Sequence, residues 1–212
     1  MLLLDELGRE HRLVDDVAGA LVRFSERATA GAVESSDVAD FVRFFRVFVA
    51  GFHHQREEET LFPALVDRAE VPADRGPLPA IAADHREAVL FVDALEAASG
   101  DPERAAEVAR RFAHHLWEHV DKEESVLLPE ARERLRRNGL TRLEGRKPTA
   151  EEQAAREVGE QLTERFPPLD DSDHVRGDGC VVCSAFGESC RGIETEWWNT
   201  WEHEYHRSLD EG

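Results

Sequence analysis

The chain has 212 residues, of which 41% are hydrophobic and 33% charged, and its formal net charge is −19. A chain of this length can hold one domain with a full core and a smaller appendage. The acidic balance argues against nucleic acid as a partner, since phosphates demand a basic surface. No apolar run approaches the length that spans a membrane, which argues against a membrane partner.

The amino-terminal stretch MLLLDEL resembles the start of a secretory signal only briefly, because Asp5 and Glu6 interrupt its apolar run. The three cysteines all fall between Cys180 and Cys190, too few and too clustered for the disulfide framework of a secreted protein. Both features favour a reducing compartment, and we expect a cytoplasmic protein.

Apolar residues recur with helical periodicity up to about residue 138 and predict four long helices. Ser35 and the Asp101-Pro102 pair are start signals for the second and fourth helices. Gly31 and Gly139 mark the ends of the first and the fourth. The predicted helices span about residues 4–28, 35–68, 80–100 and 101–138.

The two halves of this helical region resemble each other. EHRLVDDVAGAL in the first helix matches DHREAVLFVDAL in the third, which aligns His11 with His85. HHQREEETLFP in the second helix matches HVDKEESVLLP in the fourth when Pro63 is set against Pro129. Each proline should kink or end its helix at an equivalent point, because proline cannot continue the hydrogen-bond ladder.

The matched stretches of the second and fourth helices each carry a His-x-x-x-Glu pair, whose two members share one helix face. One such pair is usually a surface ion pair, but two pairs and two lone histidines on helices with apolar flanks point to a buried cluster. Burying these groups unpaired costs several kcal/mol. A metal removes that cost by pairing the carboxylates and holding the imidazoles neutral. The predicted metal ligands are His11, His53, Glu57, His85, His119 and Glu123.

Four histidines and two carboxylates are too many for one tetrahedral zinc site with an open position. They suit two six-coordinate ions between the helices of a bundle, which need about twelve positions together. Two bridging glutamates would fill four positions, the histidines four, and a bridging oxo or hydroxo group two. Two positions are then open to an external ligand, or one if a further residue joins the set.

His115 is the candidate for that further ligand, because it lies one turn before His119 on the same helix face. The alternative is a residue that lines the pocket beside the metals. His54 falls opposite Val120 in the repeat alignment, and no second histidine matches it. We therefore expect the two remaining His/Glu pairs to lie toward solvent or outside the ligand set: His54 with Glu58 and His114 with Glu118.

With EEETLFP and EESVLLP following the helix-borne ligands, the pattern resembles a hemerythrin-like (HHE cation-binding) domain over about residues 1–138. The resemblance implies an all-α, up-down-up-down four-helix bundle around a non-haem di-iron centre that binds O2, NO or peroxide. Oxygen-carrying hemerythrins instead have two histidines four apart on the third helix and a His-x-x-x-x-Asp motif on the fourth. Here Ile81 and Val89 flank His85, and the last motif ends in Glu123, which argues against reversible oxygen carriage.

The composition changes after Gly145, and we expect a bundle over residues 1–140 and an extension with short helices over 146–212. TAEEQAAREVGEQLTERF predicts a short helix with a Thr149/Glu152 capping box. Beyond it, a Cys-x-x-Cys motif and nearby histidines could form a zinc or thiol redox site. The alternative is a tail of free thiols whose tryptophans pack on the bundle. The residues concerned are Cys180, Cys183, Cys190, His203 and His206, with His174 as a substitute histidine.

Three functions are compatible with the sequence. The first is a di-iron protein that binds O2, NO or peroxide for sensing, scavenging or iron handling. The second is a di-iron enzyme that decomposes peroxide or reduces NO. The third is a regulatory module in which iron occupancy changes how the Trp- and Cys-rich tail meets a partner. No general acid or base stands out, so the sequence leaves open whether the centre is catalytic.

Overall fold

The computed structural model describes residues 2–168, and all of the regular structure in that range is helical. The first long helix is α1 (Leu2–Thr29), and the third is α4 (Pro77–Ala97). The second is continuous through α2 (Ser35–Arg43), η1 (Phe44–His54), η2 (Glu57–Leu61) and α3 (Phe62–Ala69), where η denotes π-helical geometry. The fourth joins α5 (Pro102–Lys122), η3 (Glu123–Leu127) and α6 (Leu128–Arg137), and a separate helix, α7 (Ala150–Arg165), follows.

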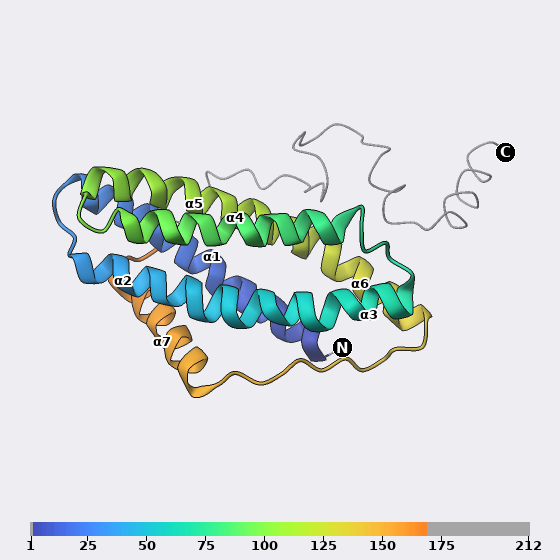
Figure 1. Cartoon of the computed structure of the whole chain (residues 1–212). Coiled ribbons are helices and arrows are strands. Elements are labelled where there is room, and N and C mark those ends of the chain that lie inside the picture. The colour runs from blue at the N-terminus through green and yellow to red at the C-terminus, as the bar shows by residue number, and fades with distance from the viewer. Residues whose placement is uncertain (1, 169–212) are drawn as a thin grey trace.

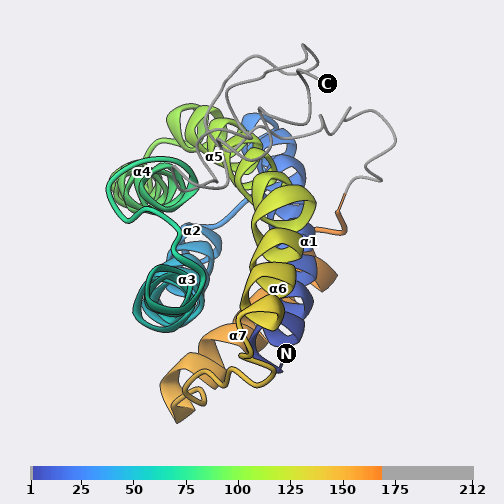
Figure 2. The ribbon, with the colours of Figure 1, turned by 90° about the vertical axis from the view of Figure 1, so that its right-hand side faces the viewer.

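The four long helices run alternately up and down, each antiparallel to the one before it in the chain (Figure 1). Viewed along the bundle, α1, α2/α3, α4 and α5/α6 surround a common interior, and α7 lies outside them (Figure 2). The predicted all-α, up-down-up-down four-helix bundle is therefore confirmed.

Most helix ends follow the sequence signals. The exception is α2, whose N-cap is Glu34 and not Ser35, and the Asp37 carboxylate accepts a hydrogen bond from the Glu34 backbone N–H at 2.8 Å. The Asp101 carboxylate accepts a hydrogen bond from the backbone N–H of Arg104 at 3.1 Å and so caps α5. Gly31 and Gly139 adopt φ values of 70° and 78°, the left-handed conformation that ends a helix and favours glycine. The third helix begins earlier than predicted, at Pro77, because proline suits the first turn of a helix.

Widened π-helical turns stand just before both repeat prolines. Pro63 and Pro129 each follow such a turn, η2 and η3, and each occupies the first turn of the α-helix that comes next. A proline ring clashes with the carbonyl four residues earlier and offers no N–H, so the tighter α-helical turn is disfavoured there. The predicted interruption therefore takes the form of a π-helical turn. Glu57 and Glu123 are the first residues of these two turns.

A polar layer divides the interior into two apolar clusters. One cluster holds most of the buried phenylalanines, including Phe45 and Phe112, whose ring centroids lie 4.6 Å apart. The other is built mainly from leucines of all four long helices, and Leu7 near the amino end of α1 is one of them. On α1, Leu7 belongs to one cluster and Val14 to the other, and His11 lies between them. Each long helix thus passes from an apolar end through a polar level to another apolar end.

The helix α7 packs across α1, α2 and η1 and buries Ala155, Gly159 and Leu162. A Cβ atom at Gly159 would lie 2.4 Å from ring atoms of Phe44, so only glycine permits this approach. The predicted capping box is confirmed, since Thr149 and Glu152 each bond the other's backbone N–H.

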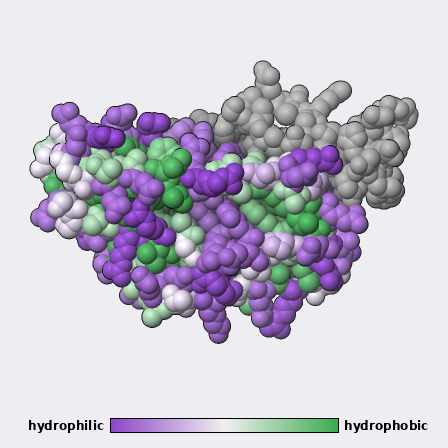
Figure 3. Space-filling model, in the orientation of Figure 1, coloured by the Kyte–Doolittle hydropathy of each residue, from purple (hydrophilic) through white to green (hydrophobic). Residues whose placement is uncertain are grey.

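Hydrophilic side chains cover most of the face seen in Figure 3, and hydrophobic ones form scattered groups there. Val89 and Leu90 on α4 are the large apolar side chains exposed mid-bundle in the described residues, at 42% and 67%. Within residues 2–168, no helix is both long and apolar enough to cross a membrane.

Candidate metal centre

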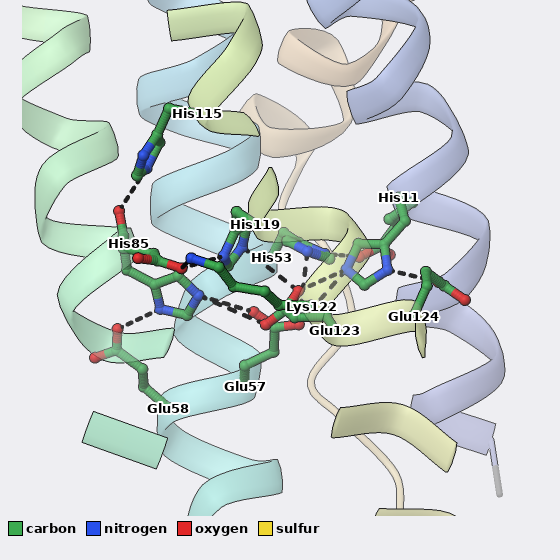
Figure 4. Close-up of polar contacts among 12 residues, drawn as sticks. His11, His53, Glu57, Glu58, His85, His115, His119, Lys122, Glu123 and Glu124 are labelled. Atoms are coloured by element: carbon green, nitrogen blue, oxygen red, sulfur yellow. Dashed lines mark hydrogen bonds and ion pairs between the residues drawn. The ribbon is translucent and has the colours of Figure 1, made fainter. Parts of the chain in front are cut away.

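Six side chains from the four long helices meet in the polar layer (Figure 4). They are the six that the sequence repeat predicted, and each is at most 4% exposed. The helical register explains the meeting, because each residue lies on the inward stripe of its own helix. The six are His11 on α1, His53 on η1, Glu57 on η2, His85 on α4, His119 on α5 and Glu123 on η3.

The Nε2 atoms of the four histidines face the two carboxylates. Each carboxylate contacts one histidine from its own half of the repeat and one from the other half, as a group bridging two ions would. The distances from Nε2 to the nearest of these carboxylate oxygens are 3.6 Å for His53–Glu57, 3.4 Å for His85–Glu57, 3.0 Å for His11–Glu123 and 3.4 Å for His119–Glu123.

Acidic side chains lie at the opposite ring nitrogens. Three of the four Nδ1 atoms are in hydrogen-bond contact with a carboxylate, and the fourth faces one at a longer distance. A carboxylate at Nδ1 fixes the tautomer that leaves Nε2 free to bind a metal. The pairs are His11–Glu124 at 2.6 Å, His85–Glu58 at 2.7 Å, His53–Glu10 at 2.9 Å and His119–Asp84 at 3.7 Å.

These acidic partners follow the same repeat as the histidines. Glu58 and Glu124 are 66 positions apart, which is the shift that relates the two His-x-x-x-Glu motifs. Glu10 and Asp84 each stand immediately before the lone histidine of their half. Sequence reasoning did not assign these roles, although the repeat carried the signal. Glu58 was expected toward solvent or outside the ligand set, and its side chain is 46% exposed while it holds His85.

Cations support two of these carboxylates from behind. Lys122 lies 2.9 Å from Asp84, and the buried Arg56 donates hydrogen bonds to Glu10 and Glu6. Burial opposes the ionisation of Glu10 and Asp84, but the facing histidine and cation outweigh it and lower the pKa of both carboxyl groups. Both side chains therefore stay ionised and act as hydrogen-bond acceptors near neutral pH.

The ionisable groups of the centre shift one another's pKa, so that its carboxylates favour the negative form and two of its histidines the positive form. Burial and the nearby Glu123 oppose ionisation of Glu57, yet the surrounding histidines outweigh both and lower its pKa. Burial likewise opposes the charge on His11 and His85, but their contacts with Glu123, Glu57 and the outer carboxylates raise the pKa of both rings. Two adjacent buried carboxylates thus draw positive charge into the site, which protons or metal ions can supply.

The nitrogen and oxygen atoms at the centre make poor hydrogen bonds with one another but are suitable ligands for a pair of metal ions. Both oxygens of Glu57 and both of Glu123 are buried, as are the Nε2 atoms of His11, His85 and His119, and none of these atoms makes a hydrogen bond of normal geometry although they face one another as ion pairs. Each unsatisfied buried polar atom costs about 1–3 kcal/mol. Imidazole nitrogens and carboxylate oxygens are the donors that iron and related divalent metals accept, so the residues fit the metal that the sequence pattern implies.

The prediction that His54 lies toward solvent is wrong. His54 is 4% exposed, and its ring stacks on that of His85 with centroids 3.8 Å apart. The prediction assumed an α-helical register, whereas His54 ends the π-helical segment η1, whose longer turn rotates the inward face. The repeat held the missed signal, since its counterpart Val120 is apolar and also buried, at 1% exposure.

His115, for which the sequence left open a ligand role and a place beside the metals, lies apart from the six converging residues. Its Nε2 is 3.0 Å from the backbone oxygen of Asp84 (Figure 4). Its ring packs near that of Phe91. Side chains on an α-helix lean toward the amino terminus, so a residue one turn before His119 reaches away from Glu123. This placement corresponds to the alternative reading of a residue beside the site.

The last predicted surface pair behaves as expected, because the His114 side chain is 69% exposed and lies 3.1 Å from Glu118. The predicted zinc or redox site of the extension lies outside the described residues. Its members are Cys180, Cys183, Cys190, His203 and His206, with His174 as the substitute.

A four-helix bundle whose middle layer gathers four histidines and two carboxylates is the architecture of a metal-binding helical bundle. The sequence matches the family model described as the hemerythrin HHE cation binding domain over residues 2–131. The chain therefore belongs to the hemerythrin HHE cation-binding family. No match was found among the curated proteins or the solved structures.

Proposed function

We propose that the protein holds two iron ions in this centre and binds O2, NO or peroxide there, for sensing, scavenging or iron handling. The observation that carries the proposal is the set of buried, unpaired donor atoms on two carboxylates and three facing imidazoles. Two ions would neutralise the paired carboxylates and complete the bonding of every one of those atoms. Bound iron would supply redox chemistry and open coordination positions for a small ligand.

The residues around the centre orient its metal-binding histidines and keep bulk water away from it. The outer carboxylates fix the imidazole rings, and the two apolar clusters keep bulk water from both sides of the polar layer. A groove of about 330 Å³ approaches the centre between η1 and α4 and reaches His54 and His85. It offers a route by which a molecule the size of O2, NO or peroxide reaches the buried histidines.

The test is an optical spectrum of anaerobically purified, iron-loaded protein before and after addition of O2, NO or peroxide. A ligand-binding centre gives a new charge-transfer band that saturates at a fixed ratio of ligand to protein. An iron-loaded protein whose spectrum is unchanged by all three molecules would contradict the proposed function.

The second candidate is a di-iron enzyme that decomposes peroxide or reduces NO. The groove that reaches His54 and His85 would also give product a way out. The same samples separate the two functions, because an enzyme consumes many equivalents of peroxide or NO per chain while a sensor or scavenger stops at the binding ratio.

A further inference from the structure

His54 is a buried histidine with an unexplained nitrogen. Its ring is 4% exposed, and its Nδ1 is buried with no hydrogen-bond partner. The Nδ1 atoms of His11, His53 and His85, by contrast, all contact a carboxylate, and that of His119, although not hydrogen-bonded, faces Asp84 at 3.7 Å. A buried imidazole nitrogen left unpaired costs about 1–3 kcal/mol, so its presence at this position needs a chemical reason.

Packing alone does not supply that reason. The repeat places Val120 at the equivalent point of the other half, where an apolar side chain fills the space at 1% exposure. A valine or leucine at position 54 would meet the same packing requirement without burying a polar atom. The chain nevertheless carries an imidazole here, next to two other imidazoles of the centre.

The geometry groups His54 with one side of the metal centre. His54, His85 and His119 each offer a ring nitrogen, and these three atoms lie within 4.8 Å of one another. His11, His53, Glu57 and Glu123 form a second group with the same spacing. The two groups are the donor sets that two neighbouring ions would share between them.

We propose that His54 is a seventh protein ligand of the centre and coordinates the same ion as His85 and His119. This inference rests on the proposed function, because it presupposes that the centre binds metal. The rings of His54 and His85 are nearly parallel, at 9°, so His54 must turn about its side-chain bonds to aim a nitrogen at the shared ion. The groove beside it is lined by the small residues Ala50 and Gly51.

A seventh ligand makes the two ions unequal. One ion receives three imidazoles and the other receives two, with the two carboxylates shared. Of about twelve coordination positions, the number open to external ligands falls from two to one. The remaining position belongs to the ion on the side of His11 and His53. An external ligand would then have one free coordination position on the metal pair instead of two.

Cobalt(II) is a suitable probe, because its visible absorption reports ligand number and it accepts the same donors as iron. The experiment compares wild type with His54→Ala, His54→Gln and the exposed control His114→Ala. If His54 is a ligand, both His54 variants still bind two cobalt ions. Their visible spectra change, and one of the two ions is lost to a chelator about 10–100 times faster. Added imidazole restores the wild-type spectrum of His54→Ala, and His114→Ala behaves as wild type.

Several outcomes overturn the inference. A His54→Ala protein with the wild-type cobalt spectrum and release rate shows that His54 is not a ligand. Equal loss of both ions, unaffected by imidazole, shows that His54 only supports the packing of the bundle. His54→Gln keeps a polar side chain of similar size and decides the question if the alanine variant does not fold. A wild-type protein that binds no cobalt and no iron would instead contradict the proposed function itself.

Discussion

Among the single residues, the acidic side chains that face the Nδ1 atoms orient the imidazole rings of the centre. Glu58 and Glu124 occupy equivalent positions in the repeat and contact His85 and His11 at 2.7 Å and 2.6 Å. Both contacts are shorter than an ordinary neutral hydrogen bond, as expected where one partner is charged. The carboxylates fix each ring and make its Nε2 a better donor.

Replacing Glu58 or Glu124 by glutamine should therefore weaken metal binding. We expect the metal affinity to fall about 10–100-fold for each variant, because the ring loses both its orientation and its electron-donating partner. Competition with a coloured chelator measures the change. Glu59→Gln is the matched control, since Glu59 is the next residue along and hydrogen-bonds only Gln55 among the described residues. Equal losses in Glu59→Gln and Glu58→Gln would mean that the effect is a general loss of surface charge.

Sequence reasoning succeeded at the residue scale where the repeat supplied two independent copies of a signal. His53 and Glu57 were distinguishable from surface residues because His119 and Glu123 repeat their spacing. His115 has no counterpart, and its ring direction depends on the lean of helical side chains and on the carbonyl of Asp84. Spacing alone does not contain that information.

The π-helical turns are the decisive feature at the scale of elements. Glu57 and Glu123 are the first residues of two of these turns, and both turns precede a proline. Sequence reasoning predicted an interruption at each proline but retained the α-helical register before it, which is why His54 was misplaced. Whether a helix forms a π-helical turn depends on the packing around it, including the polar cluster at its interior face. No short sequence motif predicts such a turn.

The docking of α7 depends on one close contact, which gives a second prediction. Gly159→Ala adds a Cβ that would lie 2.4 Å from the fully buried ring of Phe44. We expect a net loss of about 1–2 kcal/mol in unfolding free energy, because overpacking outweighs the gain in helix propensity. Urea unfolding measures it. Gly100→Ala, where the added Cβ meets nothing within 4 Å, should be nearly neutral. If Gly159→Ala were stabilising, α7 would not pack on Phe44.

The start of α7 contains an ion pair whose effect depends on pH. The Arg146 guanidinium hydrogen-bonds both oxygens of Glu152 at 2.7 Å and 2.8 Å and is the main cause that lowers the pKa of Glu152 to about 2. Because the folded pKa is below the unfolded value of 4.5, Glu152 stabilises the protein fully above that pH. The contribution disappears as pH falls toward about 2.

Glu152→Gln should therefore be less stable than wild type near neutral pH by about 1–2 kcal/mol, and the difference should shrink below about pH 4. Denaturant unfolding at several pH values measures the difference. Glu151→Gln is the control, because Glu151 is exposed and forms no described ion pair. A difference between Glu152→Gln and wild type that stays constant down to pH 3 would show that the Glu152 charge is not its source.

At the scale of the whole molecule, the polar layer joins the four long helices through one cluster. Each helix supplies at least one of the six converging side chains, and apolar clusters lie on both sides of the layer. The periodicity of the sequence was enough to predict this bundle. The position of α7 was not predictable, because it depends on contacts such as Gly159 with Phe44, which lie far apart in the chain.

We propose that the polar layer holds two metal ions, and the metal content of the purified protein measures this number. Protein from iron-replete cells should contain about two iron ions per chain. His53→Ala and Glu123→Ala should fall well below two, because each removes a donor and leaves others unpaired, while His114→Ala should keep both ions. A wild-type protein that holds a single zinc ion in the bundle and takes up no iron would contradict the account.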